Sequence, residues 1–172
     1  MQLAFVIPAY NEEALIGKCV ESVLAEVKRS GRPGIDVVVV NNNSTDRTAE
    51  VAASYDGVRV VDERQKGLVS ARDGGFHATT AELVANIDGD TVVPPGWLDT
   101  VFAEFEKDPE LVCLSGPYIY YDLSPWNRFL ITLFYGLTKL IYAVNRYVLR
   151  VGSVVQGGNF VFRRDAWIKA GG

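Results

Sequence analysis

Histidine and cysteine are scarce in this sequence, which has one histidine and two cysteines in 172 residues. His77 falls on the expected surface of a helix, so neither a histidine-based catalytic triad nor a histidine-rich metal site is expected. Cys19 and Cys113 lie far apart among apolar residues, which favours two buried thiols over a disulfide. The first apolar run has no basic leader before it, and together these features indicate a reducing, cytoplasmic setting.

Clustered positive charge and the common phosphate-binding glycine motifs are also missing. The formal net charge is −4, the pI is about 5.0, and lysine and arginine form no block, so a nucleic-acid partner is not expected. Neither G-x-G-x-x-G nor G-x-x-x-x-G-K-[ST] occurs. The sequence therefore supports neither a dinucleotide-binding Rossmann fingerprint nor a P-loop.

A hydrophobic run long enough to cross a membrane is absent as well. Residues 129–144 are apolar on nearly every face, but as a helix they would span only about 24 Å against a bilayer core of about 30 Å. Two interpretations stay open for residues 126–150. They contact a membrane peripherally at its cytoplasmic face, or they form a buried or oligomer-interface helix. The cations that would meet anionic headgroups are Arg128, Lys139, Arg146 and Arg150.

Short apolar runs alternate with longer segments of helical periodicity along most of the chain. This pattern predicts an α/β fold with a mostly parallel, Rossmann-like sheet that helices cover on both faces. Asn11 is expected to cap the first helix, and Asn43 or Ser44 the second. The expected strands are 3–7, 35–40, 58–61 and 82–87, and the helices between them are 12–29, a segment that ends near residue 55, and 69–79.

The pattern changes after Asp90. A helix over 97–107, an alternating strand over 111–121, the apolar helix and a strand near 159–162 predict a mixed or antiparallel C-terminal part of the sheet. We expect residues 1–172 to form a single domain, because the chain is too short for two well-packed ones.

Polar residues follow three of the expected strands directly. In open parallel sheets, ligands bind beyond the carboxyl ends of the strands, so these segments are expected to line one site. They are residues 8–12, 41–46 and 88–90.

Asp88 and Asp90 flank a glycine at the end of a buried strand and are the most informative of these residues. Two carboxylates placed in this way suit a hard cation, Mg²⁺ or Mn²⁺, whose other ligands are the phosphate oxygens of a diphosphate. The alternative is a solvated turn in which one of the aspartates caps the next segment.

Each of the other segments has two interpretations. Residues 41–46 cap a helix, contact a ligand, or do both, and residues 8–11 form a ligand-binding loop or an ordinary turn. Arg72 reaches a nucleotide, pairs with a carboxylate, or lies on a solvated face. Gly157 and Gly158 form a tight turn or let the backbone approach the sugar or acceptor closely.

Five segments in order resemble family 2 glycosyltransferases, which have the GT-A fold and usually invert the anomeric centre. They are VIPAYNEE (6–13), VVVVNNNSTDRT (37–48), KGLVSARDGG (66–75), ANIDGDTVVPPGWL (85–98) and GGNFVFRRDAW (157–167). The resemblance implies a donor nucleotide-sugar site with a divalent metal at Asp88 and Asp90. The nucleotide-sugar residues that it implies are Pro8, Ala9, Tyr10, Glu12, Asn41, Arg72 and Asp88.

This sequence departs from the family pattern in two places. Asn41 stands where the family usually has an aspartate against the base, which leaves the choice of nucleobase open. Members usually continue past a pair like Gly171 and Gly172 into a Glu-Asp segment whose aspartate is the general base. No residue here matches that base, and Asp165 is expected to begin a helix instead.

The resemblance implies a metal-dependent, inverting transfer of a sugar from a nucleoside diphosphate to a saccharide or lipid-linked acceptor of cell-envelope polysaccharide. Residues 1–95 would be the nucleotide-binding half, and 96–172 a partial acceptor half that lacks the base. One alternative is a non-catalytic nucleotide-sugar-binding module or an inactive truncated relative. A nucleotidyltransferase is a weaker one, because those enzymes typically use glycine- and lysine-rich entry loops.

Overall fold

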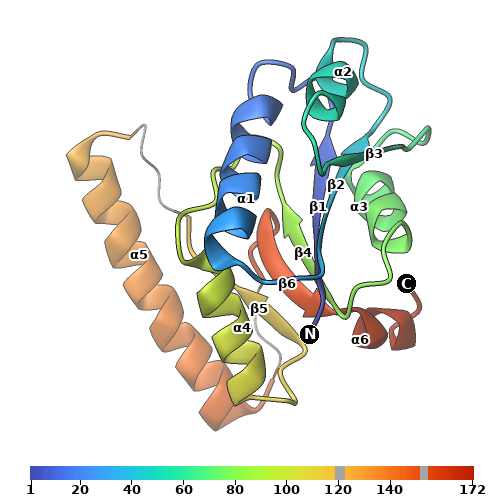
Figure 1. Ribbon diagram of the computed structural model, residues 1–172. Helices are drawn as coiled ribbons and strands as arrows, with labels where there is room; N and C mark the ends of the chain where they lie inside the picture. Colours follow the sequence, from blue (N-terminus) through green and yellow to red (C-terminus); the bar gives the residue numbers. More distant parts are fainter. Residues whose placement is uncertain (119–122, 152–154) are drawn as a thin grey trace.

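The computed structural model describes residues 1–118, 123–151 and 155–172, and its strands and helices alternate as the sequence predicts (Figure 1). The strands are β1 (Leu3–Ala9), β2 (Ile35–Asn41), β3 (Arg59–Asp62), β4 (Leu83–Ile87), β5 (Cys113–Ser115) and β6 (Asn159–Arg163). The helices are α1 (Ile16–Ser30), α2 (Thr48–Ala53), α3 (Leu68–His77), α4 (Trp97–Lys107), α5 (Pro125–Ala143), the π-helix η1 (Val144–Leu149) and α6 (Arg164–Lys169).

One mixed sheet with the strand order β3-β2-β1-β4-β6-β5 forms the centre of the fold. Strands β1 to β4 are parallel, and β6 runs antiparallel to both β4 and β5, so the predicted α/β architecture with a mixed C-terminal part is confirmed. Strands β2 and β3 lie on one side of β1, and β4 lies on the other. This makes the carboxyl ends of β1 and β4 a topological switch point, where open sheets bind ligands.

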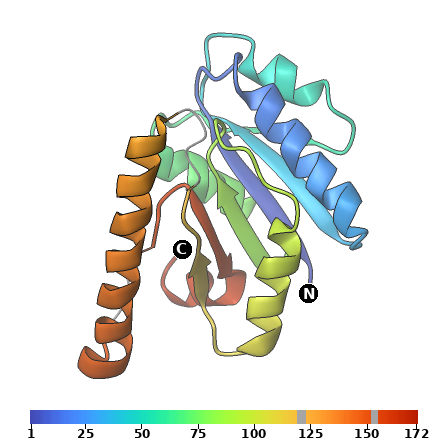
Figure 2. The same cartoon turned by 90° about the vertical axis from the view of Figure 1, so that its left-hand side faces the viewer.

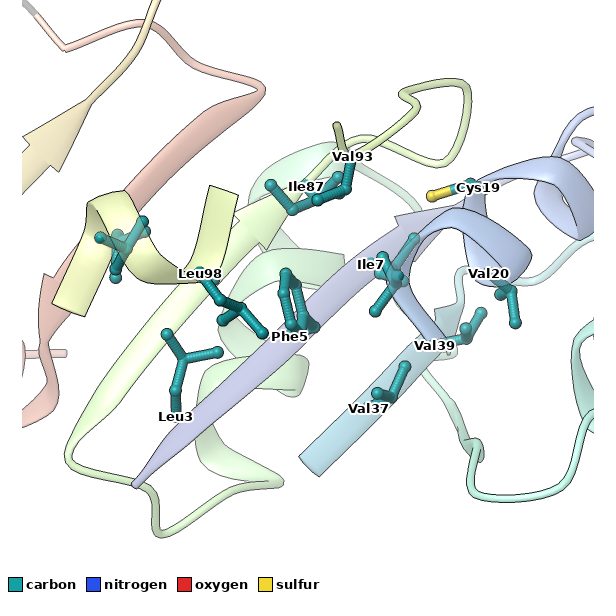
Figure 3. Packing of buried hydrophobic residues seen from close by; sticks show 14 of the residues in the cluster. Leu3, Phe5, Ile7, Cys19, Val20, Val37, Val39, Ile87, Val93 and Leu98 are labelled. Carbon is teal, nitrogen blue, oxygen red and sulfur yellow. The ribbon is translucent and has the colours of Figure 1, made fainter. Parts of the chain in front are cut away.

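Hydrophobic side chains cover both faces of the sheet, as predicted. Every residue of β1 is buried, and its side chains alternate between the two faces. Phe5 and Ile7 pack into a cluster with α1 and α4, whereas Val6 packs with α3 on the other face. Figure 3 shows the first cluster. Phe5 also lies against Trp97, with ring centroids 5.3 Å apart. Truncating a buried ring of this kind costs about 3–5 kcal/mol.

The starts of α1 and α2 differ from the prediction. Asn11 has a left-handed backbone (φ 55°), and α1 begins only at Ile16, so Asn11 is not the N-cap. Asn43 is also left-handed (φ 59°), and α2 begins at Thr48. In both places long-range contacts between the two loops satisfy backbone N–H groups that a helix cap would otherwise satisfy.

Two other expectations about the C-terminal part were wrong in extent. The strand expected over 111–121 is limited to β5, and residues 119–121 of that prediction lie outside the described residues. Cys19 is buried as expected, but Cys113 is only partly buried; both thiols are free.

Helix α5 has no buried residue, so the interpretation of residues 126–150 as a helix buried within this chain is wrong. The helix lies at the side of the sheet layers in both views of the molecule (Figures 1 and 2). Among the described residues, no helix has both the length and the apolar character that a membrane span requires.

Candidate functional site

The loops that follow β1 and β2 are joined by hydrogen bonds at the switch point. The side-chain oxygen of Asn11 accepts the N–H of Thr45 at 2.8 Å, and the N–H of Glu12 donates to Thr48 Oγ1 at 2.8 Å. Glu13 accepts the N–H of Arg47 at 2.9 Å. These bonds hold residues 11–13 away from a helical path, which explains the late start of α1, and they fix the backbone of Glu12 at the site.

Tyr10 is exposed at the end of β1 and pairs with Lys66, which follows β3. The Lys66 Nζ lies 4.8 Å from the ring centroid of Tyr10 and donates to its hydroxyl at 3.1 Å. An exposed aromatic ring beside a cation offers a stacking surface and positive charge to a nucleotide. Pro8 and Ala9, by contrast, are buried in the sheet, so only their backbone borders the loop.

The three consecutive asparagines have three different environments. Asn41 donates from Nδ2 to Asp62 Oδ1 at 2.8 Å, and its Oδ1 accepts the N–H of Ser44 at 3.2 Å. Asn42 is buried; it donates to the carbonyls of residues 63 and 65 and accepts the N–H of Gly67, so it holds the loop after β3 in place. Asn43 is exposed and has a left-handed backbone (φ 59°), so Asn41 is partly exposed, Asn42 is buried and Asn43 faces solvent.

Arg72 of α3 connects β4 to the segment before β6. Its Nη2 lies 3.2 Å from Asp88 Oδ1 and 2.6 Å from the carbonyl oxygen of Gly157. Asn86 donates to the same carbonyl at 3.3 Å, and the N–H of Asp88 donates to the carbonyl of Gly158 at 3.2 Å. Arg72 thus pairs with a carboxylate and does not lie on a solvated face: its side chain is only 19% exposed.

Two buried polar atoms at this place have no hydrogen-bond partner among the described residues: Arg72 Nε and Asn86 Oδ1. Such atoms are costly in a folded protein unless something else satisfies them. Gly158 packs so closely that a Cβ there would overlap the carboxylate of Asp88 and the hydroxyl of Tyr118. The Gly157–Gly158 segment forms a turn, as one of the two interpretations expects, and lies directly against the Asp88 side chain.

Carboxylates gather around Glu12. Its pKa is raised above the ordinary value, first because partial burial removes solvent and then because Asp90, Asp46 and Asp88 repel its negative charge. A divalent cation among these groups would relieve that repulsion. In the described part of the chain, no three histidine, cysteine, aspartate or glutamate side chains are close enough to hold a metal by themselves.

A site of this kind fits Mg²⁺ or Mn²⁺ that is held together with a substrate. These ions commonly use one or two carboxylates and take their other ligands from phosphate oxygens and water. Asp88 is partly exposed and held by Arg72, and Asp90 is exposed in the same loop. These two residues can supply the two carboxylates.

The sequence model that describes the glycosyl transferase family 2 matches residues 4–170, which is nearly the whole chain. The chain belongs to glycosyl transferase family 2. This confirms the family that the five motifs indicate.

Glycosyltransferases of bacteria and archaea are similar to this chain, which spans about half of their own length. Glycosyltransferase GlyG of Streptococcus pneumoniae is 25% identical over 172 residues, covering 96% of this chain and 54% of that protein. An uncharacterized glycosyltransferase of Mycobacterium tuberculosis is 40% identical over 107 residues, covering 62% and 45%. Glucosyl-dolichyl phosphate glucuronosyltransferase of Haloferax volcanii is 26% identical over 177 residues, covering 100% and 56%.

Solved structures share the fold of this family 2 chain. A mannosyltransferase of Pyrobaculum calidifontis in complex with GDP-Man and Mn²⁺ has a TM-score of 0.75 at 20% identity, covering 99% of this chain and 47% of that one. Glucosyl-3-phosphoglycerate synthase of Mycobacterium tuberculosis in complex with Mn²⁺, UDP and phosphoglyceric acid has a TM-score of 0.67 at 21% identity, covering 95% and 56%. These similarities confirm the GT-A-like fold.

The sequence did not predict three site residues of this family 2 chain. Asp62 at the end of β3 pairs with Asn41, Lys66 lies over Tyr10, and Asn86 contacts the carbonyl of Gly157. The polar Asn86 inside the apolar run LVANI was the available signal, because a buried amide in a central strand needs a partner. Asp62 and Lys66 had no comparable signal.

The two residues that were expected to lie apart from the site do so. Asp165 lies in the first turn of α6 and accepts a hydrogen bond from Lys169 at 3.0 Å, which confirms its place at a helix start. His77 is exposed at the end of α3, where its ring packs against Trp167 at 4.9 Å. Neither residue contacts the loops that follow β1, β2 and β4.

Proposed function

We propose that this chain binds a nucleoside-diphosphate sugar together with Mn²⁺ or Mg²⁺ and forms the donor part of an inverting glycosyltransferase. The observation that carries the proposal is the junction of Arg72, Asp88 and the Gly157 carbonyl at the switch point of the sheet. This junction brings together the Arg72 guanidinium, the Asp88 carboxylate and the Gly157 backbone. The carboxylates of Asp90 and Glu12 lie beside it. This is the combination that a diphosphate bound through a metal requires.

Each part of the site has a distinct proposed role. Tyr10 and the amide of Asn41 border the nucleoside, and Arg72 places positive charge beside the diphosphate. Asp88 and Asp90 would hold the cation, which when bound offsets the charge that develops on the leaving diphosphate. Arg72 also fixes the orientation of the Asp88 carboxylate before any ligand arrives, which lowers the cost of ordering the site on binding.

The acceptor is proposed to be a saccharide or a lipid-linked sugar used for cell-envelope polysaccharide at the cytoplasmic side of a membrane. The relative of Haloferax volcanii supports a lipid-linked acceptor, because its name specifies glucosyl-dolichyl phosphate. The reaction also needs a carboxylate to take the proton of the acceptor hydroxyl. The family resemblance places that base after a Gly-Gly pair, and the chain spans about half the length of the relatives that it matches.

A non-catalytic nucleotide-sugar-binding module is the second candidate, since the groups gathered at the site, Arg72, Asp88 and Asp90, account for donor binding alone. Both candidates require metal-dependent donor binding, and they differ in chemistry. Release of free sugar from the donor, or its transfer to an added acceptor, would identify the enzyme. Metal-dependent binding without either reaction would identify the binding module.

Calorimetric titration with GDP, UDP and their sugars, in Mn²⁺, Mg²⁺ or EDTA, tests the proposal. We expect binding that needs the metal and that Asp88→Asn/Asp90→Asn abolishes. The matched control is Asp56→Asn/Asp165→Asn, which removes the same charge at exposed positions outside the site loops and should bind as the unchanged chain does. Binding that is equal in EDTA, or equal in the two double variants, would refute the metal site.

A further inference from the structure

Helix α5 exposes a large apolar surface that no other part of the described chain covers. None of its 19 residues is buried, and Leu133, for example, is 64% exposed. The exposed large apolar residues on one side of the helix, here called the α5 face, are Trp126, Phe129, Leu130, Leu133, Phe134, Leu137, Leu140 and Ile141. Exposed apolar patches of this kind mark sites of interaction with a partner or a membrane.

The α5 face is directed away from the domain. At about 100° per residue, its members fall within an arc of roughly 140° on the helix surface. Tyr135 lies opposite the centre of that arc, and its hydroxyl oxygen accepts hydrogen bonds from the N–H of Tyr118 at 3.1 Å and from Gln156 Nε2 at 3.3 Å. The side that carries Tyr135 therefore attaches the helix to the domain, and the apolar side faces outward.

Charge distinguishes this part of the chain from the rest. Residues 123–151 contain no aspartate or glutamate, although the whole chain has a net charge of −4. Arg128 and Lys139 lie on the side of α5 opposite the apolar arc, Arg146 lies in η1, and Arg150 follows it. Lysine and arginine on one side with tryptophan, phenylalanine and leucine on the other are typical of helices that lie in the surface of anionic membranes.

We propose that the α5 face docks on the surface of a membrane that contains anionic lipids. The apolar arc enters the boundary between headgroups and acyl chains, and the long cationic side chains reach the headgroups from the opposite side. Trp126 at the start of α5 and Tyr147 in η1 are aromatic residues of the type enriched at this boundary. The inference does not depend on the identity of the sugar donor, so it can fail or hold independently of the proposed function.

Sedimentation of the 172-residue chain with lipid vesicles tests the proposal. Vesicles of phosphatidylcholine with phosphatidylglycerol should bind the chain at least about tenfold more tightly than vesicles of phosphatidylcholine alone, and added salt should weaken the binding. Leu133→Ser/Leu137→Ser should lose at least about tenfold in affinity, because two side chains of the apolar arc are removed. Lys139→Gln/Arg146→Gln should lose about 25-fold on the anionic vesicles.

The matched control is Val112→Ser/Ile168→Ser, which replaces two exposed apolar residues outside α5 and should bind as the unchanged chain does. All these side chains are exposed, so circular dichroism should show the same fold in every variant. Absence of binding to anionic vesicles, or equal binding to both vesicle types, would overturn the proposal. A dimer that Leu133→Ser/Leu137→Ser dissociates, without vesicle binding, would assign the α5 face to a second copy of the chain.

Discussion

Arg72 and Asp88 form an ion pair at the centre of the candidate site, with Nη2 and Oδ1 3.2 Å apart, and the same Nη2 holds the carbonyl of Gly157 at 2.6 Å. One guanidinium thus connects α3, the end of β4 and the segment before β6. The pair orients a proposed metal ligand and at the same time keeps a backbone turn next to it. Several expected outcomes depend on contacts of this type.

Replacing Arg72 should weaken donor binding. We expect Arg72→Ala to reduce the affinity for the nucleoside-diphosphate sugar by about 10- to 100-fold, since a hydrogen bond to a charged group is worth about 1.5–3 kcal/mol. Arg72→Lys should restore little, because a single ammonium does not reproduce the planar guanidinium donors. Calorimetry measures both variants. Arg47→Ala, which removes an exposed arginine near the site, should leave the affinity unchanged, and an equal loss there would argue against a specific role of Arg72.

The two neighbouring glycines should respond differently to alanine. Gly158→Ala places a Cβ onto the Asp88 carboxylate and the Tyr118 hydroxyl. We expect this variant to lower the free energy of unfolding by about 1–3 kcal/mol and to lose metal-dependent donor binding. Gly157→Ala meets only the Arg72 guanidinium at 3.9 Å and should behave like the unchanged chain. Urea unfolding and calorimetry test this pair. Similar behaviour of the two variants would contradict the close approach.

Glu26 of α1 should stabilise the start of α4. Its buried carboxylate accepts the N–H groups of Gly96 at 3.0 Å and Leu98 at 2.9 Å and pairs with Arg29. We expect Glu26→Gln to lower the free energy of unfolding by about 1.5–3 kcal/mol at neutral pH. The exposed Glu50 provides the control, because Glu50→Gln should change stability by less than about 0.5 kcal/mol.

The contribution of Glu26 should depend on pH. Desolvation acts to raise its pKa, but the hydrogen bonds from Arg29, Leu98 and Gly96 outweigh it, so the pKa lies below the ordinary value of 4.5. A lowered pKa means that the stabilisation is present above the pKa of the unfolded chain and is lost as pH falls through the folded value. The stability difference between the unchanged chain and Glu26→Gln should therefore shrink below about pH 4.5. A difference that stays constant down to acid pH would contradict this linkage.

The thiol of Cys19 should be protected from labelling. Burial, followed by repulsion from Asp90 and Asp88, raises its pKa to about 12, so almost no thiolate is present at neutral pH. In a Cys113→Ser variant, a thiol reagent at pH 8 should label Cys19 only as fast as the chain unfolds. Rapid labelling of the folded variant would show that the region between α1 and the loop after β4 is open.

Local pattern was sufficient to predict most of the secondary structure. The sequence predicts the strand β1, the alternation of strands with helices, and the helix over 97–107. It does so because burial of one face leaves apolar residues at a period of two in strands and of 3.6 in helices. Asp88 and Asp90 were found in the same way, as polar residues directly after a buried strand. The helix starts near Asn11 and Asn43 were not, because their N–H partners lie 33 or more residues away along the chain.

The sequence by itself therefore determined the order and type of the elements, the family, and the positions of the polar segments along the chain. Tertiary structure decided which of those segments meet. Arg72 and Gly157 are 85 residues apart in the sequence, and they meet only because β6 pairs with β4 next to α3. The composition of α5 likewise did not determine that its apolar face is exposed. An apolar helix has the same sequence pattern whether a domain, a second copy or a membrane covers it.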